Sequence, residues 1–170
     1  ESIRFGQEKI IATPHLGAST TEAQTSSAVS VARQIMDIFS GMPAAYAVNA
    51  PLIPPETISL MTPFLPLGTA IGRLVSQISD GQLNSIKITY EGEVSVPDPS
   101  AIKAAILGGL LEKVSEERVN LVNANLIAAQ RGLEVVEQKD TACKNYASLV
   151  TVEVKTRKGL PTVAGTVLHD

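Results

Sequence analysis

One of the two histidines in this chain, His15, lies in a segment whose residue types could perform acid/base chemistry. The segment reads Pro14-His15-Leu16-Gly17-Ala18, between a short apolar run and a helical pattern. An imidazole exchanges its proton near neutral pH, which suits a general acid or base. Gly17 and Ala18 would leave room for a flat ring to approach. The alternative left open by these residues is an incidental histidine in a strand-to-helix turn.

The elements on either side of His15 predict one βα unit. Residues 10–13 form a wholly apolar run, typical of a buried parallel strand, and ligands of open α/β sheets gather at the carboxyl ends of such strands. Ser19 and Glu22 fit a capping box, which predicts a helix from there to about Phe39. The helix has one apolar stripe, formed by Ala28, Val31, Ala32, Ile35, Ile38 and Phe39.

A proline-rich stretch follows and predicts a domain boundary. Residues 43–66 contain six prolines, which favour a stiff, extended connection. We therefore expect a remnant of an α/β domain at 1–50, a Pro-rich linker at 51–66 and a second domain at 67–170.

The second domain is predicted to be α+β, with a mostly antiparallel sheet and helices packed on one side. Helices are expected from Pro63, behind Thr62 as cap, to Asp80-Gly81, from Asp98-Pro99-Ser100 to the weakening glycines 108 and 109, and over 119–131. Strands are expected around 86–90, 133–138, 148–155 and 161–168, with Gly159 left-handed in the last hairpin. Gly68 and Gly72 are explained by helix packing.

Composition excludes several classes of partner and site. The net charge is −3 without a long basic run, so we expect no nucleic-acid partner. No apolar run approaches the roughly 20 residues of a membrane helix, so no membrane partner is expected. The single cysteine, Cys143, excludes an internal disulfide and fits a reducing, cytoplasmic location. Because no His or Cys metal-ligand motif occurs, we predict no metal site, and His169 is expected to be a solvated surface residue.

Four stretches carry a resemblance to a known family. Residues 11–24 resemble the closing active-site segment of the D-isomer-specific 2-hydroxyacid dehydrogenases. Residues 47–51, together with 121–125 and 130–132, are similar to the long-form phosphoglycerate dehydrogenase family, which carries an extra domain after its catalytic core. The resemblance spans essentially the whole chain.

The resemblance implies a role for His15 as the acid/base residue of NAD-dependent 3-phosphoglycerate oxidation, in serine biosynthesis. His15, Leu16, Gly17 and Ala18 would lie beside the nicotinamide of NAD. The family's substrate arginine, orienting glutamate and dinucleotide-binding loop precede this motif and are missing here. We therefore expect this chain alone to be inactive, with a regulatory or assembly role.

The resemblance also implies an intervening, allosteric substrate-binding domain, with the serine-sensing ACT domain of the family absent. Its partner would be a small phosphorylated 2-hydroxy or 2-oxo acid, bound through Lys139, Lys144 and Tyr146. Ala147 and Glu153 stand where some relatives carry basic residues. A solvated charged loop is therefore the alternative at this place.

Three other functions stay open. The second domain could be a non-enzymatic anion-binding module. The apolar stripe over 20–39 needs a cover, which favours a homo-oligomer and an assembly role. Another D-2-hydroxyacid dehydrogenase, such as a glyoxylate or lactate reductase, is the remaining alternative, against which the extra domain argues.

Overall fold

The computed structural model describes residues 16–39, 51 and 53–168, and the chain divides into one unit at 1–44 and another at 45–170. In the first unit, the described residues form one helix, α1 (Thr21–Phe39), after a short turn. The strand predicted at 10–13 lies outside the described residues. The helix reaches Phe39, as predicted, and Phe39 is the last described residue of this unit.

The predicted capping box at the start of α1 is wrong by one residue. The side chain of Thr20, not Ser19, caps the helix, because its Oγ1 accepts the N–H of Ala23 at 3.2 Å. Glu22 therefore lies in the first turn, where a negative charge is favourable beside the exposed N–H groups.

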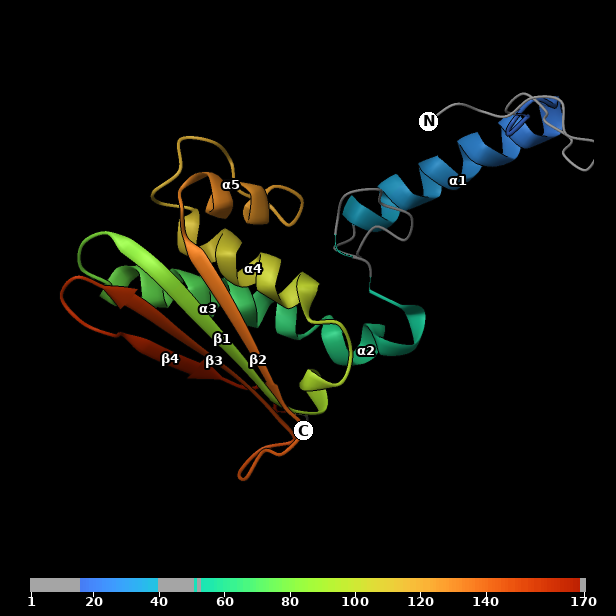
Figure 1. Cartoon of the computed structure of the whole chain (residues 1–170). Coiled ribbons are helices and arrows are strands. Elements are labelled where there is room, and N and C mark those ends of the chain that lie inside the picture. The colour runs from blue at the N-terminus through green and yellow to red at the C-terminus, as the bar shows by residue number, and fades with distance from the viewer. Residues whose placement is uncertain (1–15, 40–50, 52, 169–170) are drawn as a thin grey trace, which may run out of the picture. The chain divides into compact units, whose positions relative to one another are not determined.

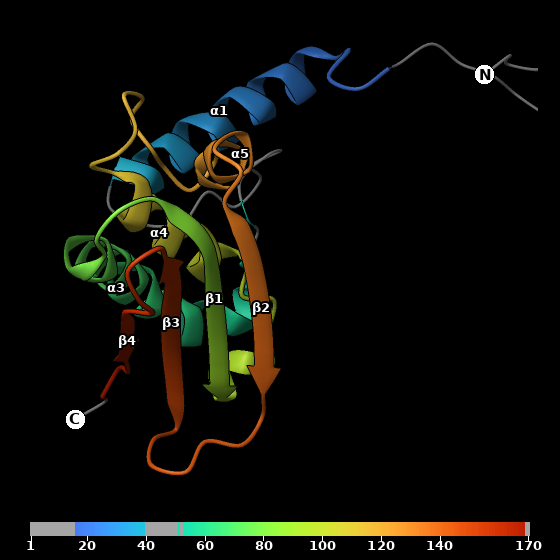
Figure 2. The same ribbon diagram turned by 60° about the vertical axis from the view of Figure 1, so that its left-hand side comes forward.

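The second unit is a four-stranded mixed sheet with helices on one face (Figures 1 and 2). The strand order is β2-β1-β3-β4, with β1 and β2 parallel and the other two pairs antiparallel. The α+β prediction is confirmed, with the parallel pair as a difference. The elements are η1 (Pro55–Thr57), α2 (Ile58–Met61), α3 (Phe64–Ile78), β1 (Leu83–Gly92), η2 (Glu93–Ser95), α4 (Ser100–Leu111), α5 (Ala124–Gln130), β2 (Glu134–Asp140), β3 (Ser148–Thr156) and β4 (Thr162–Gly165).

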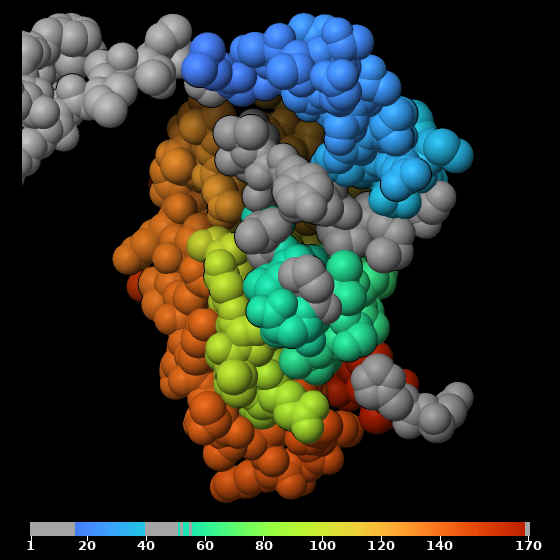
Figure 3. Space-filling view, turned by 90° about the vertical axis from the view of Figure 1, so that its right-hand side faces the viewer, coloured from blue at the N-terminus to red at the C-terminus, as the bar shows by residue number. Residues whose placement is uncertain are grey.

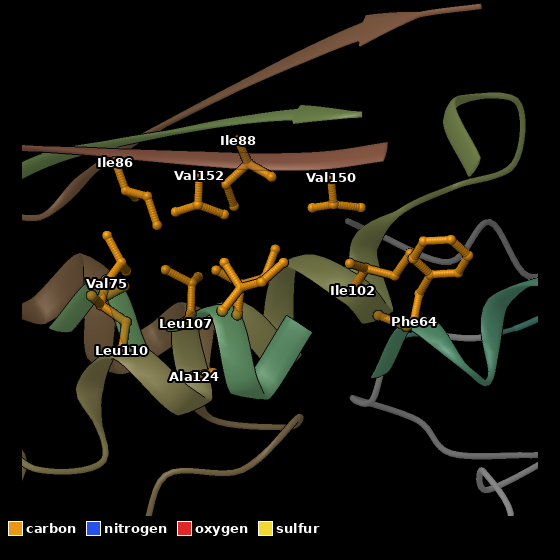
Figure 4. Packing of buried hydrophobic residues seen from close by; sticks show 14 of the residues in the cluster. Phe64, Val75, Ile86, Ile88, Ile102, Leu107, Leu110, Ala124, Val150 and Val152 are labelled. Carbon is orange, nitrogen blue, oxygen red and sulfur yellow. The ribbon is translucent and has the colours of Figure 1, made fainter. Parts of the chain in front are cut away.

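Alternating side chains bury one face of the sheet, as the sequence predicted. Ile86, Ile88 and Tyr90 of β1 are completely buried, and the intervening residues of β1 face away from the helices. Val150, Val152 and Val154 of β3 are buried beside them. Figure 4 shows side chains of both strands pointing toward apolar residues of α3 and α4. This packing fixes the register, since a slip of one residue would expose the apolar set.

Helices α3 and α4 cross in close contact at glycines. A Cβ on Gly72 would lie 2.1 Å from the backbone oxygen of Ile106, and one on Gly109 would lie 2.2 Å from that of Thr69. Packing therefore explains Gly72, as predicted. Gly109 was expected only to weaken the helix end. Helix α4 instead continues through it to Leu111, and the close crossing with α3 requires a residue without a Cβ at this position.

The proline-rich stretch differs from the expected extended connection. It holds η1, α2 and the start of α3, with Pro63 rather than Thr62 at the N-cap position. Ile53, Met61 and Phe64 are buried in the core of the second unit. Proline is compatible with a first helical turn, so the prolines at 51–66 did not prevent helices here. The domain limits themselves stay a prediction.

Within the described residues, one stretch is long and apolar enough, by length and composition alone, to cross a membrane: Ile58–Ile78, which joins α2 to α3. The sequence was expected to hold no such run. Ile71 and Val75 from this stretch pack in the core against the sheet, so burial inside the unit accounts for its apolar character.

The third predicted helix, at 119–131, is shorter in the structure. Asn120 Oδ1 accepts the N–H groups of Val122 and Asn123 at 2.8 and 3.1 Å, which holds a turn in place of a helix before Ala124. The predicted stop at Gly132 is confirmed: its φ is 67°, and the next residue, Leu133, donates back to the oxygen of Ala128 at 3.0 Å.

The last hairpin closes differently from the prediction. Gly159 does not have a positive φ, so the prediction of a left-handed conformation at this residue is wrong. Thr156 closes the turn instead. Its N–H donates to the oxygen of Gly159 at 3.0 Å, and its Oγ1 accepts the N–H of Lys158 at 3.2 Å.

Candidate effector site and the dehydrogenase segment

The segment around His15 is described only in part. His15 lies outside the described residues, as does His169. Leu16, Gly17 and Ala18 form an exposed turn in which Leu16 is 63% exposed. Ala18 has a φ of 57°, a left-handed conformation that is unfavourable for a residue with a Cβ. Such backbone outliers are frequent where a ligand is held, so this turn stays a candidate contact.

The predicted contact with a nicotinamide falls on this turn, whose residues Leu16, Gly17 and Ala18 are exposed. Dinucleotide phosphates are held by a glycine-rich loop at a helix N-terminus, and the sequence contains no G-x-G-x-x-G. A contact of this turn with NAD therefore stays a prediction.

Lys139 lies near the end of β2 and faces the helices. It is paired in register with Tyr90, whose side chain is buried on that face. Lys139 Nζ donates to the backbone oxygen of Pro97 at 3.1 Å. Figure 3 shows the yellow-green segment around Pro97 lying against the orange surface of β2 and the loop that follows it. Lys139 therefore helps to hold this segment against the strand.

A charged network surrounds Lys139 on the same face. Glu137 accepts from Lys103 Nζ at 2.7 Å and from the buried Tyr90 hydroxyl at 3.3 Å. Burial raises the pKa of Tyr90, and the negative charge of Glu137 raises it further, so this phenol stays protonated and donates. The network joins β1, β2 and α4, and each carboxylate oxygen of Glu137 accepts one hydrogen bond in it.

Asp98 holds the N-terminus of α4. Its Oδ1 accepts the hydroxyl of Ser100 at 2.6 Å and the N–H of Ser100 at 3.1 Å. The hydroxyl bond is the main cause that lowers the pKa of Asp98, and the positive charges of Lys139 and Lys103 act in the same direction. The negative charge also faces the positive end of the helix dipole.

Replacing Asp98 with Ala is expected to lower the free energy of unfolding by about 1 kcal/mol at neutral pH. Because folding lowers the pKa of Asp98, its stabilisation is present above the unfolded value of about 3.9 and is lost as pH falls through the folded value. The stabilities of the two proteins in urea unfolding should therefore begin to converge as pH falls below about 4, and should coincide only below the folded pKa of Asp98. Asp80→Ala, which removes an exposed ion pair with Lys158, is the control and should change stability by less than about 1 kcal/mol. A loss at Asp98 that is the same at every pH would contradict this role.

Lys144 and Tyr146 line a hollow at the end of the sheet, on the face opposite the helices. The hollow has a volume of about 370 Å³. Its floor is a row of three residues from neighbouring strands: Glu91 is paired with Asp140 on one side and with Leu149 on the other. Its wall is the loop between β2 and β3, from Ala142 to Tyr146.

Gly92 fixes the position of this loop. Its φ is 76°, and a Cβ there would lie 2.1 Å from the oxygen of Ala147. Without that side chain, the loop approaches the strand, and the N–H of Glu93 donates to the same oxygen at 2.9 Å. Val94 N–H then donates to Ser148 Oγ at 3.1 Å. The end of β1 thus supports the wall of the hollow directly.

The structure brings together two of the three predicted effector residues. Lys144 and Tyr146 share the hollow, whereas Lys139 is not among its lining residues and faces the other side of the sheet. Sequence reasoning missed Glu91 and Asp140. The outward positions of the predicted strands could have indicated both acids, but their neighbourhood depends on the parallel pairing of β1 with β2.

Two further charged side chains of this unit have local partners. Glu153 pairs with Lys87 across the strands at 3.7 Å, and Arg131, at the C-cap of α5, donates to the backbone oxygen of Val114. Among the described residues, no group of three or more His, Cys, Asp or Glu is placed to hold a metal ion.

Comparison with known proteins places this arrangement in a family. A family model described as the D-3-phosphoglycerate dehydrogenase intervening domain matches residues 60–170. The chain is 36% identical over 162 residues to D-3-phosphoglycerate dehydrogenase of Synechocystis, which covers 95% of this chain and 29% of that protein. It is 34% identical to the enzyme of that name from Methanocaldococcus jannaschii, over 96% of this chain and 31% of that protein. It is 39% identical to the chloroplastic D-3-phosphoglycerate dehydrogenase 2 of Arabidopsis thaliana, over 78% of this chain and 22% of that protein.

The chain thus spans less than a third of the length of these relatives. The match extends on both sides of residue 60, because it covers 95% of the chain in the first of them. The chain belongs to the D-3-phosphoglycerate dehydrogenase intervening-domain family.

Proposed function

We propose that this chain is part of an NAD-dependent D-3-phosphoglycerate dehydrogenase, which oxidises 3-phosphoglycerate to 3-phosphohydroxypyruvate. The observation that carries the proposal is the breadth of the similarity. Relatives with that name match 94–96% of the chain, which includes the segment around His15 as well as the intervening domain.

In the proposed reaction, His15 takes the proton from the 2-hydroxyl of the substrate. Bound NAD would supply the hydride acceptor. The exposed turn at Leu16–Ala18 would lie against the nicotinamide and exclude water from one side of the ring. Positioning groups supply much of the rate of such a reaction, and none can be assigned in this chain. The 170-residue chain alone should therefore be inactive.

The test is an assay of the full-length protein that contains this chain. NADH formation should be rapid with 3-phosphoglycerate and at least about a hundredfold slower with D-lactate or glycolate, since the phosphate contacts would be missing. The isolated chain should form no NADH. Preference for D-lactate or glycolate would favour another 2-hydroxyacid dehydrogenase. Turnover by the isolated chain would contradict the proposal that this chain alone is inactive.

The second unit is proposed to be the regulatory part, which binds a small effector with an anionic group at the end of the sheet. Lys144 and Tyr146 support this role, because both line a hollow of about 370 Å³, and pockets for small molecules begin at roughly 300 Å³. Binding there could alter the position of the loop, which Gly92 and Glu93 tie to β1.

An assembly role is the second candidate, and α1 favours it. No residue of this helix is buried within the described part of the chain, and Val31, Ile35 and Phe39 are 54%, 48% and 87% exposed. An apolar stripe of this size is usually covered by a partner surface. Size-exclusion chromatography with light scattering should give a mass above 17.9 kDa for the isolated chain, and a monomer would count against assembly.

A further inference from the structure

The hollow at the end of the sheet holds two carboxylates side by side. Glu91 and Asp140 are register partners on neighbouring parallel strands, which places their backbones about 4.8 Å apart. Both line the hollow. Asp140 Oδ1 accepts the N–H of Ala142 at 2.9 Å, and among the described residues neither carboxylate forms an ion pair. Like charges directly opposite each other are destabilising, so a positive group between them would relieve repulsion.

The wall of the same hollow offers groups of the opposite kind. Lys144 provides an ammonium that forms no ion pair within the described part of the chain, and Asn145 and Tyr146 provide an amide and a phenol that can donate. Leu149, Ala142 and Cys143 complete the lining. One hollow therefore presents two acids on its floor, cationic and neutral donors on its wall and an apolar patch between strand and loop.

We propose that this hollow binds a small zwitterion of the α-amino-acid class, with its ammonium between Glu91 and Asp140 and its carboxylate toward Lys144. The proposal rests on the regulatory half of the proposed function and names its ligand class. A purely anionic ligand would gain Lys144 but would lie close to two uncompensated carboxylates. The floor and the wall together thus select a molecule that carries both charges.

The test is a titration of the isolated chain, followed by NMR of the backbone amides of the loop and of β1. L-Leucine is the probe, because its side chain suits Leu149 and Ala142. N-acetyl-L-leucine lacks the ammonium and L-leucinamide lacks the carboxylate. L-Leucine should bind in the millimolar range or tighter and shift amides of residues 140–149, while both analogues should bind at least tenfold more weakly.

Two matched pairs of variants keep the result specific to the hollow. Glu91→Gln and Lys144→Gln should each weaken L-leucine binding at least tenfold. Glu134→Gln and Lys155→Gln, at the other end of the same sheet face, remove the same charges and should leave it unchanged. Retained amide dispersion shows that each variant is folded.

Equal binding of N-acetyl-L-leucine or of 3-phosphoglycerate would overturn the zwitterion and leave an anion site. The same amide shifts with calcium alone would overturn it in favour of a cation site, and no shift with L-leucine would overturn it outright. The dehydrogenase assay of the full-length protein is independent of all three results. A failure here therefore leaves the proposed activity standing, and a failure of that assay leaves this site standing.

Discussion

Replacing Gly109 with Ala is expected to lower the free energy of unfolding by about 3 kcal/mol or more, at the upper end of what overpacking costs. The added Cβ would lie 2.2 Å from the backbone oxygen of Thr69 and 3.0 Å from the N atom of Arg73. Both neighbours are backbone atoms of α3 and cannot rotate away as a side chain can. The two helices must separate, which loosens the core that they share with the sheet.

Gly108→Ala is the matched control for this prediction. Gly108 is in the same helix, one residue earlier, and a Cβ there meets nothing within 4 Å. Alanine is the better helix former by about 1 kcal/mol, so this variant should be as stable as the original or more so. Urea unfolding monitored by circular dichroism measures both. Equal changes in the two variants would show that helix propensity, not the crossing of α3 and α4, governs this place.

The sequence was sufficient to predict all four strands and three of the helices of the second unit, although β4 is shorter than the predicted 161–168 and α2 was not predicted. The inward residues of β1 and β3 alternate strictly, and a period of two has one structural solution when one face is buried. Helix α4 was harder, because it is apolar on nearly every side. Its contacts with α3, α5 and the sheet explain this composition, but no periodicity distinguishes which side faces which neighbour.

Sequence signals for helix starts were misleading where a nearby side chain forms a competing hydrogen bond with the backbone. Thr20 and Ser19 are both good caps, and only the geometry shows that Thr20 bonds to Ala23. Asn120 and Asn123 look compatible with a helix in a periodic pattern, but their side chains bond to the nearby backbone and delay its start. Prolines between residues 51 and 66 suggested an extended linker, although proline is also a favourable first residue of a helix.

The candidate effector site required knowledge of three segments far apart in the sequence. Lys139 and Lys144 are five residues apart and seemed to belong to one anion site. Because successive residues of a strand point to opposite faces, the face of Lys139 is decided by its pairing with Tyr90, which directs it to the helices. Glu91 joins the hollow only through strand pairing. A sequence pattern does not contain this register, so it could not predict that Glu91 and Asp140 lie side by side.

If the full-length protein has the proposed dehydrogenase activity, replacing His15 with Gln is expected to lower its kcat about 10²–10⁴-fold, the usual contribution of a general acid or base. Glutamine can still hydrogen-bond to the substrate hydroxyl but cannot take its proton. The KM for 3-phosphoglycerate should therefore change far less than kcat, since the contacts of the phosphate are untouched. The acidic limb of the kcat/KM profile, which protonation of the base produces, should disappear in the variant.

His169→Gln is the matched control for this prediction, because His15 and His169 are the only histidines in the chain. It should leave kcat and the pH profile unchanged. If His15→Gln retained the activity of the original enzyme, the histidine would be an incidental residue of a strand-to-helix turn, and the proton acceptor would have to be sought elsewhere in the protein. If both variants lost activity together with the circular dichroism signal of the fold, the loss would be structural, and His15 would have no demonstrated part in proton transfer. Loss of kcat with an intact fold, confined to His15, is the result that the acid/base role requires.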